Sequence, residues 1–194
     1  MQKIGWYVIG FIEGLSLMAF QLILSRILAA GFGTTLNVWA VIISATLTGL
    51  GLGYFYGGKL ASRPDRILSN LKLYWGIAFL LLVFLIFIEK SILQLSLNLP
   101  GISGIILFAI IGIVPVSFLM GTVTPMIISR LEKQDEKMDG SVSGKLYANS
   151  TLGGIVGTFL FGLVLIPEHG LWMSSVILSV LTGISYLTLY LYKN

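Results

Sequence analysis

The chain has 194 residues, of which 56% are hydrophobic and only 10% are charged. Soluble globular domains carry about 25% charged residues, so this composition excludes an ordinary soluble protein and indicates an integral membrane protein. The formal net charge of +4 does not indicate a nucleic-acid partner, because the Lys and Arg residues are scattered between apolar runs and form no basic stripe.

Six apolar stretches are long enough to cross a bilayer, which takes about 20 residues. We expect the first stretch to be a retained helix rather than a cleaved secretory signal, because it is long and carries Glu13 and Arg26. The connections between the stretches are short, so we expect one all-α membrane domain over residues 1–194. The predicted transmembrane helices cover residues 5–30, 35–58, 71–88, 102–129, 146–167 and 171–192.

The distribution of Lys and Arg predicts the orientation of these helices. Ten of the twelve lie at the amino terminus, at 59–72, at 130–145 and at the carboxyl end, while Arg26 and Lys90 lie on the opposite side. Because cytoplasmic loops retain Lys and Arg, we expect both termini to be cytoplasmic, in a bacterial or archaeal inner (plasma) membrane. The polar connection at 130–145 is either a solvated turn or a docking surface.

Two pairs of short motifs indicate an internal repeat. Residues 22–27 (Leu-Ile-Leu-Ser-Arg-Ile) resemble residues 126–131 (Met-Ile-Ile-Ser-Arg-Leu), 104 positions later. The pattern Thr-Leu-x-Gly at 46–49, followed by Gly57, returns 105 positions later at 151–154, followed by Gly162. Helices one and four begin on opposite sides of the predicted membrane, so we expect an inverted 3+3 repeat resembling half of a major facilitator transporter. The alternative is chance similarity, because apolar helices are built from few residue types.

Glycines mark the predicted contacts between helices. Gly49, Gly53 and Gly57 share one face of helix two, and Gly153 and Gly157 share one face of helix five. Lipid gives helices no hydrophobic reason to associate, so small residues that allow close backbone approach favour their packing. We therefore expect these faces to be helix contacts, and the alternative is that the glycines open a substrate path.

Several segments together resemble a known family. They are residues 14–28, 48–53, 120–122, 144–153 and 165–170. In order and spacing they are similar to the membrane domain of fused spermidine-synthase-like proteins, and the resemblance covers most of the chain. It implies a fold like half of a major facilitator, which in that family is commonly followed by a cytosolic aminopropyltransferase domain.

The sequence also departs from that family. It has no Gly-rich strand-to-helix turn with the acidic residues that would hold a nucleoside cofactor, so we expect no polyamine synthesis from this chain by itself. Gln21 stands where family members commonly carry Glu before the Arg. That difference puts in doubt any role that needs a carboxylate at this position.

Glu13 is the sharpest single candidate for a functional residue. It lies about eight residues into the first predicted helix, which corresponds to roughly 12 Å of helical rise. An ionisable group at this depth is costly unless it faces the protein interior, water or a partner, so a functional site is the first hypothesis. The alternative is a structural hydrogen bond to a neighbouring helix.

Other polar residues interrupt the apolar helices. Arg26 lies near the outer end of helix one, where it either extends to water and lipid headgroups or ties the helix to a neighbour or an anion. Gln21 lies five residues before Arg26 on this helix. A polar cluster gathers at the start of helix five, where its members either cap and pack the helix or form a substrate site: Tyr147, Asn149, Ser150 and Thr151.

Nothing in the sequence indicates an enzyme. It contains no paired carboxylates, no nucleophile beside a base, no metal-ligand cluster and no cysteine, so we expect no catalysis, no cofactor and no metal. Two functions stay open. One is a membrane-embedded subunit or anchor of a larger complex, and the other is a half-size transporter or substrate-binding module that acts as a dimer on small cationic or polyamine-like solutes. Both imply the lipid bilayer and a second copy or another protein subunit as partners.

Overall fold

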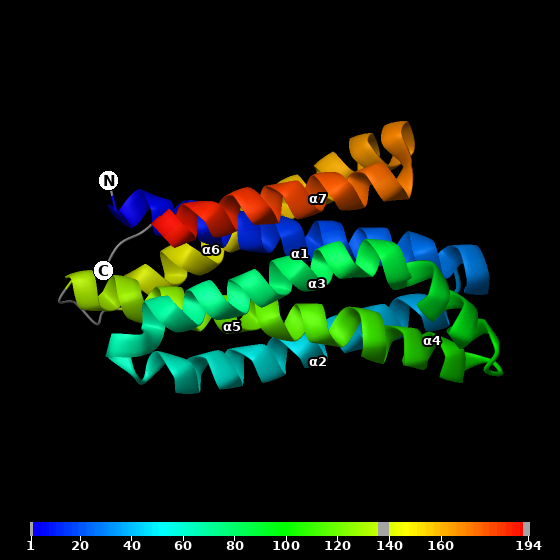
Figure 1. Ribbon diagram of the computed structural model, residues 1–194, viewed down its shortest axis with the longest axis horizontal. Helices are drawn as coiled ribbons and strands as arrows, with labels where there is room; N and C mark the ends of the chain where they lie inside the picture. The colour runs from blue at the N-terminus through cyan, green and yellow to red at the C-terminus, as the bar shows by residue number, and fades with distance from the viewer. Residues whose placement is uncertain (1, 136–139, 192–194) are drawn as a thin grey trace.

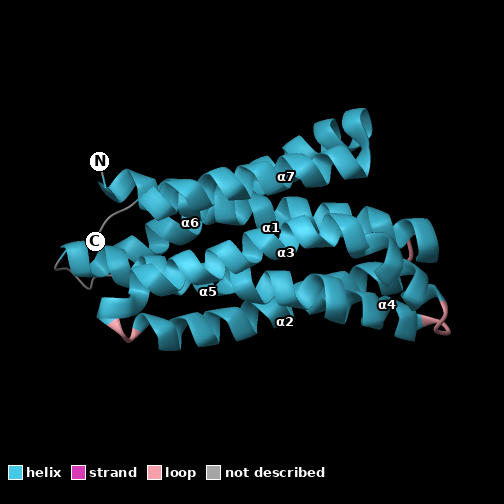
Figure 2. Ribbon diagram, in the orientation of Figure 1, coloured by secondary structure: helices cyan, strands magenta, loops and turns pink. Residues whose placement is uncertain are grey.

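The computed structural model describes residues 2–135 and 140–191, and these residues contain helices and no strand. Ninety-four per cent of the structure is helical (Figure 2). Figure 1 shows the long helices running side by side along the long axis of the molecule. The helices are α1 (Gln2–Phe32), α2 (Leu36–Ala61), α3 (Ile67–Leu97), α4 (Ile102–Phe108), α5 (Val114–Asp135), α6 (Ser141–Phe159) and α7 (Ile166–Leu191).

Five continuous helical runs are long and apolar enough to cross a membrane. This confirms the prediction of an all-α chain with several membrane-length helices. The polar connection at 130–145 falls partly on residues 136–139, which lie outside the described residues. The five runs are Ile4–Phe32, Leu36–Ala61, Ile67–Leu97, Ile102–Lys133 and Ser141–Leu191.

The last run contains a break in its helical backbone. Gly170 has φ 76° and ψ 176°, a conformation that costs glycine little and other residues much. In Figure 1 the ribbon turns back on itself between the yellow α6 and the red end of α7. The 51 residues of Ser141–Leu191 are therefore not one straight helix.

Several helices differ in extent from their predicted ranges. The fifth was predicted over 146–167, whereas α6 begins at Ser141 and passes into a π-helical turn at Leu160. The third was predicted over 71–88, whereas α3 covers Ile67–Leu97. The charged pair Glu89 and Lys90 looks like a helix end in the sequence, but the apolar pattern continues beyond it and Ile92 is buried in the bundle. The fourth was predicted as a single helix over 102–129, whereas the chain forms α4, a π-helical turn and α5.

Two π-helical turns each end two residues before a proline. The first, η2 (Ala109–Ile113), precedes Pro115, and the second, η3 (Leu160–Leu165), precedes Pro167. In each turn a backbone N–H bonds to the carbonyl five residues back, from Val114 to Ala109 and from Ile166 to Phe161. Because proline has no N–H for the usual bond four residues back, the widened turn fits a helix that already loses a bond there.

Glycines let two pairs of helices approach closely. Gly49, Gly53 and Gly57 on α2 lie against the backbone of α5, where a Cβ at Gly57 would lie 2.5 Å from the Thr122 carbonyl oxygen. The second pair is α1 and α6. Helices α3 and α7 pack against each other and against α1, and α3 also packs against α5, which closes the bundle.

Candidate functional site

Glu13 lies inside the bundle and connects three helices. Its side chain on α1 is only 2% exposed. Two hydroxyl groups donate hydrogen bonds to its Oε2 atom: Ser150 Oγ on α6 at 2.9 Å and Thr124 Oγ1 on α5 at 3.3 Å. A buried polar group is tolerated in this environment when its partners come from neighbouring helices, and Glu13 meets that condition.

Glycines on α1 and α6, which have no side chain, bring Ser150 within reach of Glu13. A Cβ at Gly14, the next residue, would overlap the backbone carbonyl of Ser150. Gly153 and Gly157 on α6 lie in the same way against carbonyl oxygens of α1. Larger residues at these positions would hold the two helices apart and lengthen the hydrogen bond from Ser150. The glycines therefore position the polar contact.

A groove of about 390 Å³ opens beside Glu13, between α1, α2 and α6. Its walls are mainly apolar, but five residues with hydroxyl groups line it: Tyr54, Tyr147, Ser150, Thr151 and Thr158. Ser150 belongs both to the groove and to the hydrogen bonds of Glu13. The buried carboxyl is therefore linked to the groove through one hydroxyl group.

The tyrosines differ from the threonines in this groove. Thr151 donates to the Tyr147 carbonyl at 2.8 Å and Thr158 to the Gly154 carbonyl at 2.8 Å. The hydroxyl hydrogen of each threonine is therefore used within its own helix. The tyrosines are half exposed, at 37% for Tyr54 and 46% for Tyr147, and Tyr54 interacts electrostatically with both Glu13 and Tyr147. A hydroxyl-bearing groove of this kind can hydrogen-bond a polar group of a ligand or of another chain.

The structure brings only some of the sequence-predicted residues together. Glu13, Tyr147 and Thr151 lie at or beside the groove. Asn149 is half-buried and donates from Nδ2 to the Tyr7 carbonyl at 2.5 Å, which ties α6 to α1.

Gln21 and Arg26 lie farther along α1. Gln21 is half-buried, whereas Arg26 is exposed. Thirteen residues separate Arg26 from Glu13, which is about 20 Å along a helix, so the two side chains cannot pair. An exposed Arg near a helix end fits the membrane-anchor interpretation.

The predicted packing glycines are buried at two helix contacts. Gly49 and Gly53 lie against the carbonyls of Val114 and Phe118 on α5, and the glycines of α6 lie against Phe11 and Leu15 on α1. Each of these positions has backbone where a side chain would be. That surrounding fits the packing interpretation better than an open substrate path. The α6 glycines concerned are Gly153 and Gly157.

Sequence reasoning missed three polar residues. Thr124 lies in an apolar run just before Pro125, and nothing in the sequence alone pairs it with Glu13. Tyr54 was hidden in an aromatic stretch on α2. Glu89 is buried on α3 at 9% exposure, and it was missed because the predicted helix ended one residue before it. The apolar residues that follow Lys90 were the signal that could have found it.

The site offers hydrogen bonding rather than metal coordination. Within residues 2–135 and 140–191, no three His, Cys, Asp or Glu side chains are grouped so that they could hold a metal ion. No family model matches the chain, and neither a curated protein nor a solved structure matches it. The geometry of the bundle is therefore what bears on function.

Proposed function

We propose that this chain is a non-catalytic, membrane-embedded subunit whose α1, α2 and α6 face is covered by another chain, with a second copy as the first candidate. The groove beside Glu13 carries this proposal. It follows α6 from Tyr147 to Phe159, which is about 18 Å of helix. Hydrocarbon offers no hydrogen-bond partner to the tyrosine hydroxyls, whereas another chain does.

The proposal includes six spans with both termini cytoplasmic. The break at Gly170 supports two spans within Ser141–Leu191, because a helix that reverses direction there crosses twice. Four further runs bring the number to six. An even number of spans leaves both ends on one side, which fits the bias of Lys and Arg.

An inverted repeat is also part of the proposal. If the two halves correspond, α1 matches α5 and α2 matches α6. The contact between α1 and α6 in one half then corresponds to the contact between α5 and α2 in the other, and both contacts are lined by glycines. The packed glycines pair as Gly49 with Gly153 and Gly53 with Gly157, 104 positions apart, which is the offset of the two Ser-Arg motifs and one position less than that of the Thr-Leu-x-Gly motifs. This arrangement supports the likeness to half of a major facilitator and to the membrane domain of spermidine-synthase-like proteins.

A half-size transporter that acts as a dimer is the second candidate. The observation that favours it is the link from the groove to Glu13 through Ser150. A ligand that hydrogen-bonds Ser150 would compete with Glu13 for its hydroxyl and so alter the contacts among α1, α5 and α6. Uptake of a labelled diamine by liposomes that contain the purified chain would favour this candidate. Absence of uptake would favour the subunit.

Cysteine cross-linking tests the covered face. The chain has no cysteine, so single cysteines can be introduced without removing others. Ile155 lines the groove and is 48% exposed, and Val180, at 54%, lies on the opposite α3 and α7 side. In native membranes Ile155→Cys should be joined between two copies by a short bis-maleimide, because a two-fold contact covers the same surface of both chains. Val180→Cys is the matched control and should stay monomeric.

The outcomes separate the alternatives. Cross-linking of Ile155→Cys to a chain of different mass would support the subunit proposal. It would identify the covering chain as another protein rather than a second copy. A monomer that leaves Cys at 155 as reactive toward a lipid-soluble maleimide as Cys at 180 would contradict the proposal, because both positions would then face lipid.

A further inference from the structure

A second buried carboxyl lies away from the groove. Glu89 is on α3, on the side that packs against α1 and α7, and is 9% exposed. It lies eight residues before the end of α3, roughly 12 Å along the helix, within a run long enough to span the membrane. Neither Glu89 nor α7 lines the groove beside Glu13, so a role for Glu89 is independent of the proposed subunit contact.

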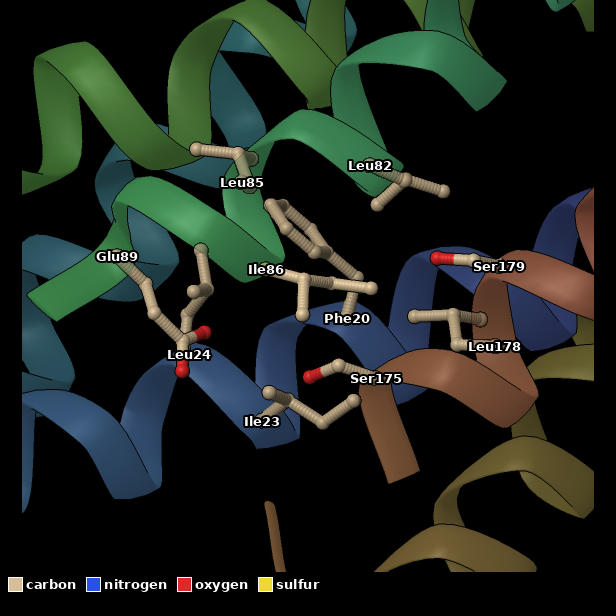
Figure 3. A pocket seen from close by; sticks show the side chains of 10 residues that line it. All are labelled: Phe20, Ile23, Leu24, Leu82, Leu85, Ile86, Glu89, Ser175, Leu178 and Ser179. Carbon is tan, nitrogen blue, oxygen red and sulfur yellow. The ribbon is translucent and has the colours of Figure 1, made fainter. Parts of the chain in front are cut away.

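A crevice of about 20 Å³ lies beside Glu89. A cavity needs about 10–15 Å³ of this kind of volume to hold one water molecule, so the crevice has room for a single small occupant. Its wall combines one carboxyl and two hydroxyl side chains with apolar ones, and Figure 3 shows them together. The lining residues are Glu89, Ser175 and Ser179, with Phe20, Ile23, Leu24, Leu82, Leu85, Ile86 and Leu178.

The two serine hydroxyls are available to an occupant. Ser175 donates to the Leu171 carbonyl at 3.0 Å, which leaves its oxygen free to accept or coordinate. Ser179 is 6% exposed, and its Oγ has no hydrogen-bond partner among the described residues. In Figure 3 both hydroxyls point from α7 toward the space between the helices. A buried hydroxyl without a partner costs free energy that an occupant would recover.

The surroundings supply little positive charge to Glu89. On α3 the neighbouring Lys90 interacts with it electrostatically, but Lys90 is exposed. On α1 the lining residues are apolar and Arg26 is exposed. On α7 the nearest charged or titratable residues are Glu168 and His169 before the serines, both exposed, and the half-buried Tyr186 after them, which carries no positive charge. A buried carboxylate without a paired cation is costly, so the crevice calls for a positive occupant.

We propose that Glu89, Ser175 and Ser179 form a binding site for one small monovalent cation, either a sodium ion or a proton held with one water molecule. Both occupants neutralise the carboxylate and fit a crevice of this size. Both also use the ligands present, because hard cations and water bind oxygen atoms. The site connects α3 and α7 across α1, away from the hydrogen bonds of Glu13.

Lipid gives a probe access to this site. An apolar groove of about 440 Å³ runs along the outer side of α3 and α7, and it shares Ile86 and Ser179 with the crevice. A lipid-soluble carbodiimide can fill this groove and reach the side of the crevice at Ile86 and Ser179, whereas a charged carbodiimide cannot. The reagent adds the carboxyl O–H across its C=N bond, and the resulting O-acylisourea rearranges to a stable N-acylurea. The residue therefore gains the mass of one carbodiimide.

The experiment treats the full chain in liposomes with dicyclohexylcarbodiimide in sodium-free buffer and maps the adduct by mass spectrometry. One adduct is expected, on Glu89. Glu89→Gln should lose the adduct, and Glu13→Gln is the matched control that should keep it, because Glu13 lies behind two hydrogen bonds among α1, α5 and α6. Mapping the adduct in the unmodified chain identifies the residue even where a variant fails to fold.

Two further comparisons identify the cation. Loss of labelling in sodium chloride but not in choline chloride assigns sodium, and labelling equal in both salts assigns the proton. Ser179→Ala should change the labelling rate or the sodium protection. Ser185→Ala should change neither, because Ser185 is also a buried α7 hydroxyl without a hydrogen-bond partner among the described residues but does not line the crevice.

Three results would overturn the cation site. One is the absence of a Glu89 adduct in both salts from mildly acidic to mildly alkaline pH. Another is equal modification of Glu89 by a charged, water-soluble carbodiimide, which would make it an exposed carboxyl. The third is equal behaviour of the Ser179→Ala and Ser185→Ala variants.

Discussion

Two carboxyl groups lie inside this helical bundle, and their surroundings differ. Glu13 has two hydroxyl donors on its Oε2 atom and lies where glycines press α1 against α6. Glu89 lies beside a small crevice that also exposes a serine hydroxyl without a partner among the described residues. The first carboxyl is bonded within the fold, whereas the second has room for an occupant. Burial alone does not distinguish a structural carboxyl from one that binds a ligand. The hydrogen-bond donors and the free space around the carboxyl make that distinction.

The largest effect is expected from reversing the charge at the structural carboxyl. Glu13→Lys would aim a cation at Ser150 and Thr124, both of which now donate to a carboxyl oxygen. An unpaired buried charge costs about 3–5 kcal/mol, so this variant should fail to give a monodisperse protein in mild detergent. Glu13→Gln is the control and should purify like the parent, because its amide oxygen still accepts. A well-folded Glu13→Lys chain would contradict this prediction, because position 13 would then have to face water or lie beside another acid.

The next effect tests the close approach that positions Glu13. Gly153→Ala would put a Cβ onto the Phe11 carbonyl of α1, whereas Gly51→Ala on α2 meets nothing within 4 Å. Overpacking of this kind costs about 1–3 kcal/mol, and Gly51→Ala should stabilise its helix by up to about 1 kcal/mol. Thermal unfolding in detergent, followed by circular dichroism, measures the difference. Equal melting temperatures for the two variants would mean that α1 and α6 are too far apart for Gly153 to contact Phe11.

A third prediction compares the two carboxyls directly. Glu13→Leu would leave two hydroxyls without their acceptor, at a cost of about 1–3 kcal/mol. Glu89→Leu removes a polar group next to a crevice that an apolar side chain can partly fill, so its cost should be less than about 1 kcal/mol. The same thermal measurement applies to both variants. A larger loss at position 89 than at position 13 would reverse the assignment of the structural role.

The smallest effect separates the two donors to Glu13. Ser150→Ala and Thr124→Val should each cost about 1 kcal/mol, with the larger loss for Ser150, whose hydrogen bond is 2.9 Å rather than 3.3 Å. Thr48→Val is the control, because Thr48 is exposed and donates only to its own helix. Its free energy of unfolding should change by less than about 0.5 kcal/mol. If all three variants melt together, the polar contact contributes nothing to stability.

The sequence predicted the features that break the apolar pattern. Glu13 is one such feature, and the glycine faces of helices two and five are another, because small or charged residues are visible against long apolar runs. It did not reveal the partners of Glu13. In a membrane protein the lipid-facing and core-facing sides are both apolar, so periodicity does not tell which face is buried or which helices meet. The approach of Ser150 and Thr124 to Glu13 depends on that packing.

The limits of α3 were missed for a related reason. A charged pair such as Glu89 and Lys90 reads as the end of a span, but α3 is longer than the hydrocarbon requires and carries the pair inside it. The widened turns before Pro115 and Pro167 were also unpredicted, because proline indicates a bend without indicating how the backbone before it responds.

These widened turns set the rotational phase of the helices that contain them. A π-helical turn accommodates one residue more than the α-helical ladder would, so the segments before and after it differ by one residue in angular position, about 100°. Deleting a single residue from Ala109–Ile113 would restore the regular ladder and rotate α4 by that angle relative to α5. Ile105 and Phe108, which are now buried, would then turn away from the bundle. A one-residue deletion in this turn should therefore change which side chains of α4 meet lipid without shortening the span noticeably.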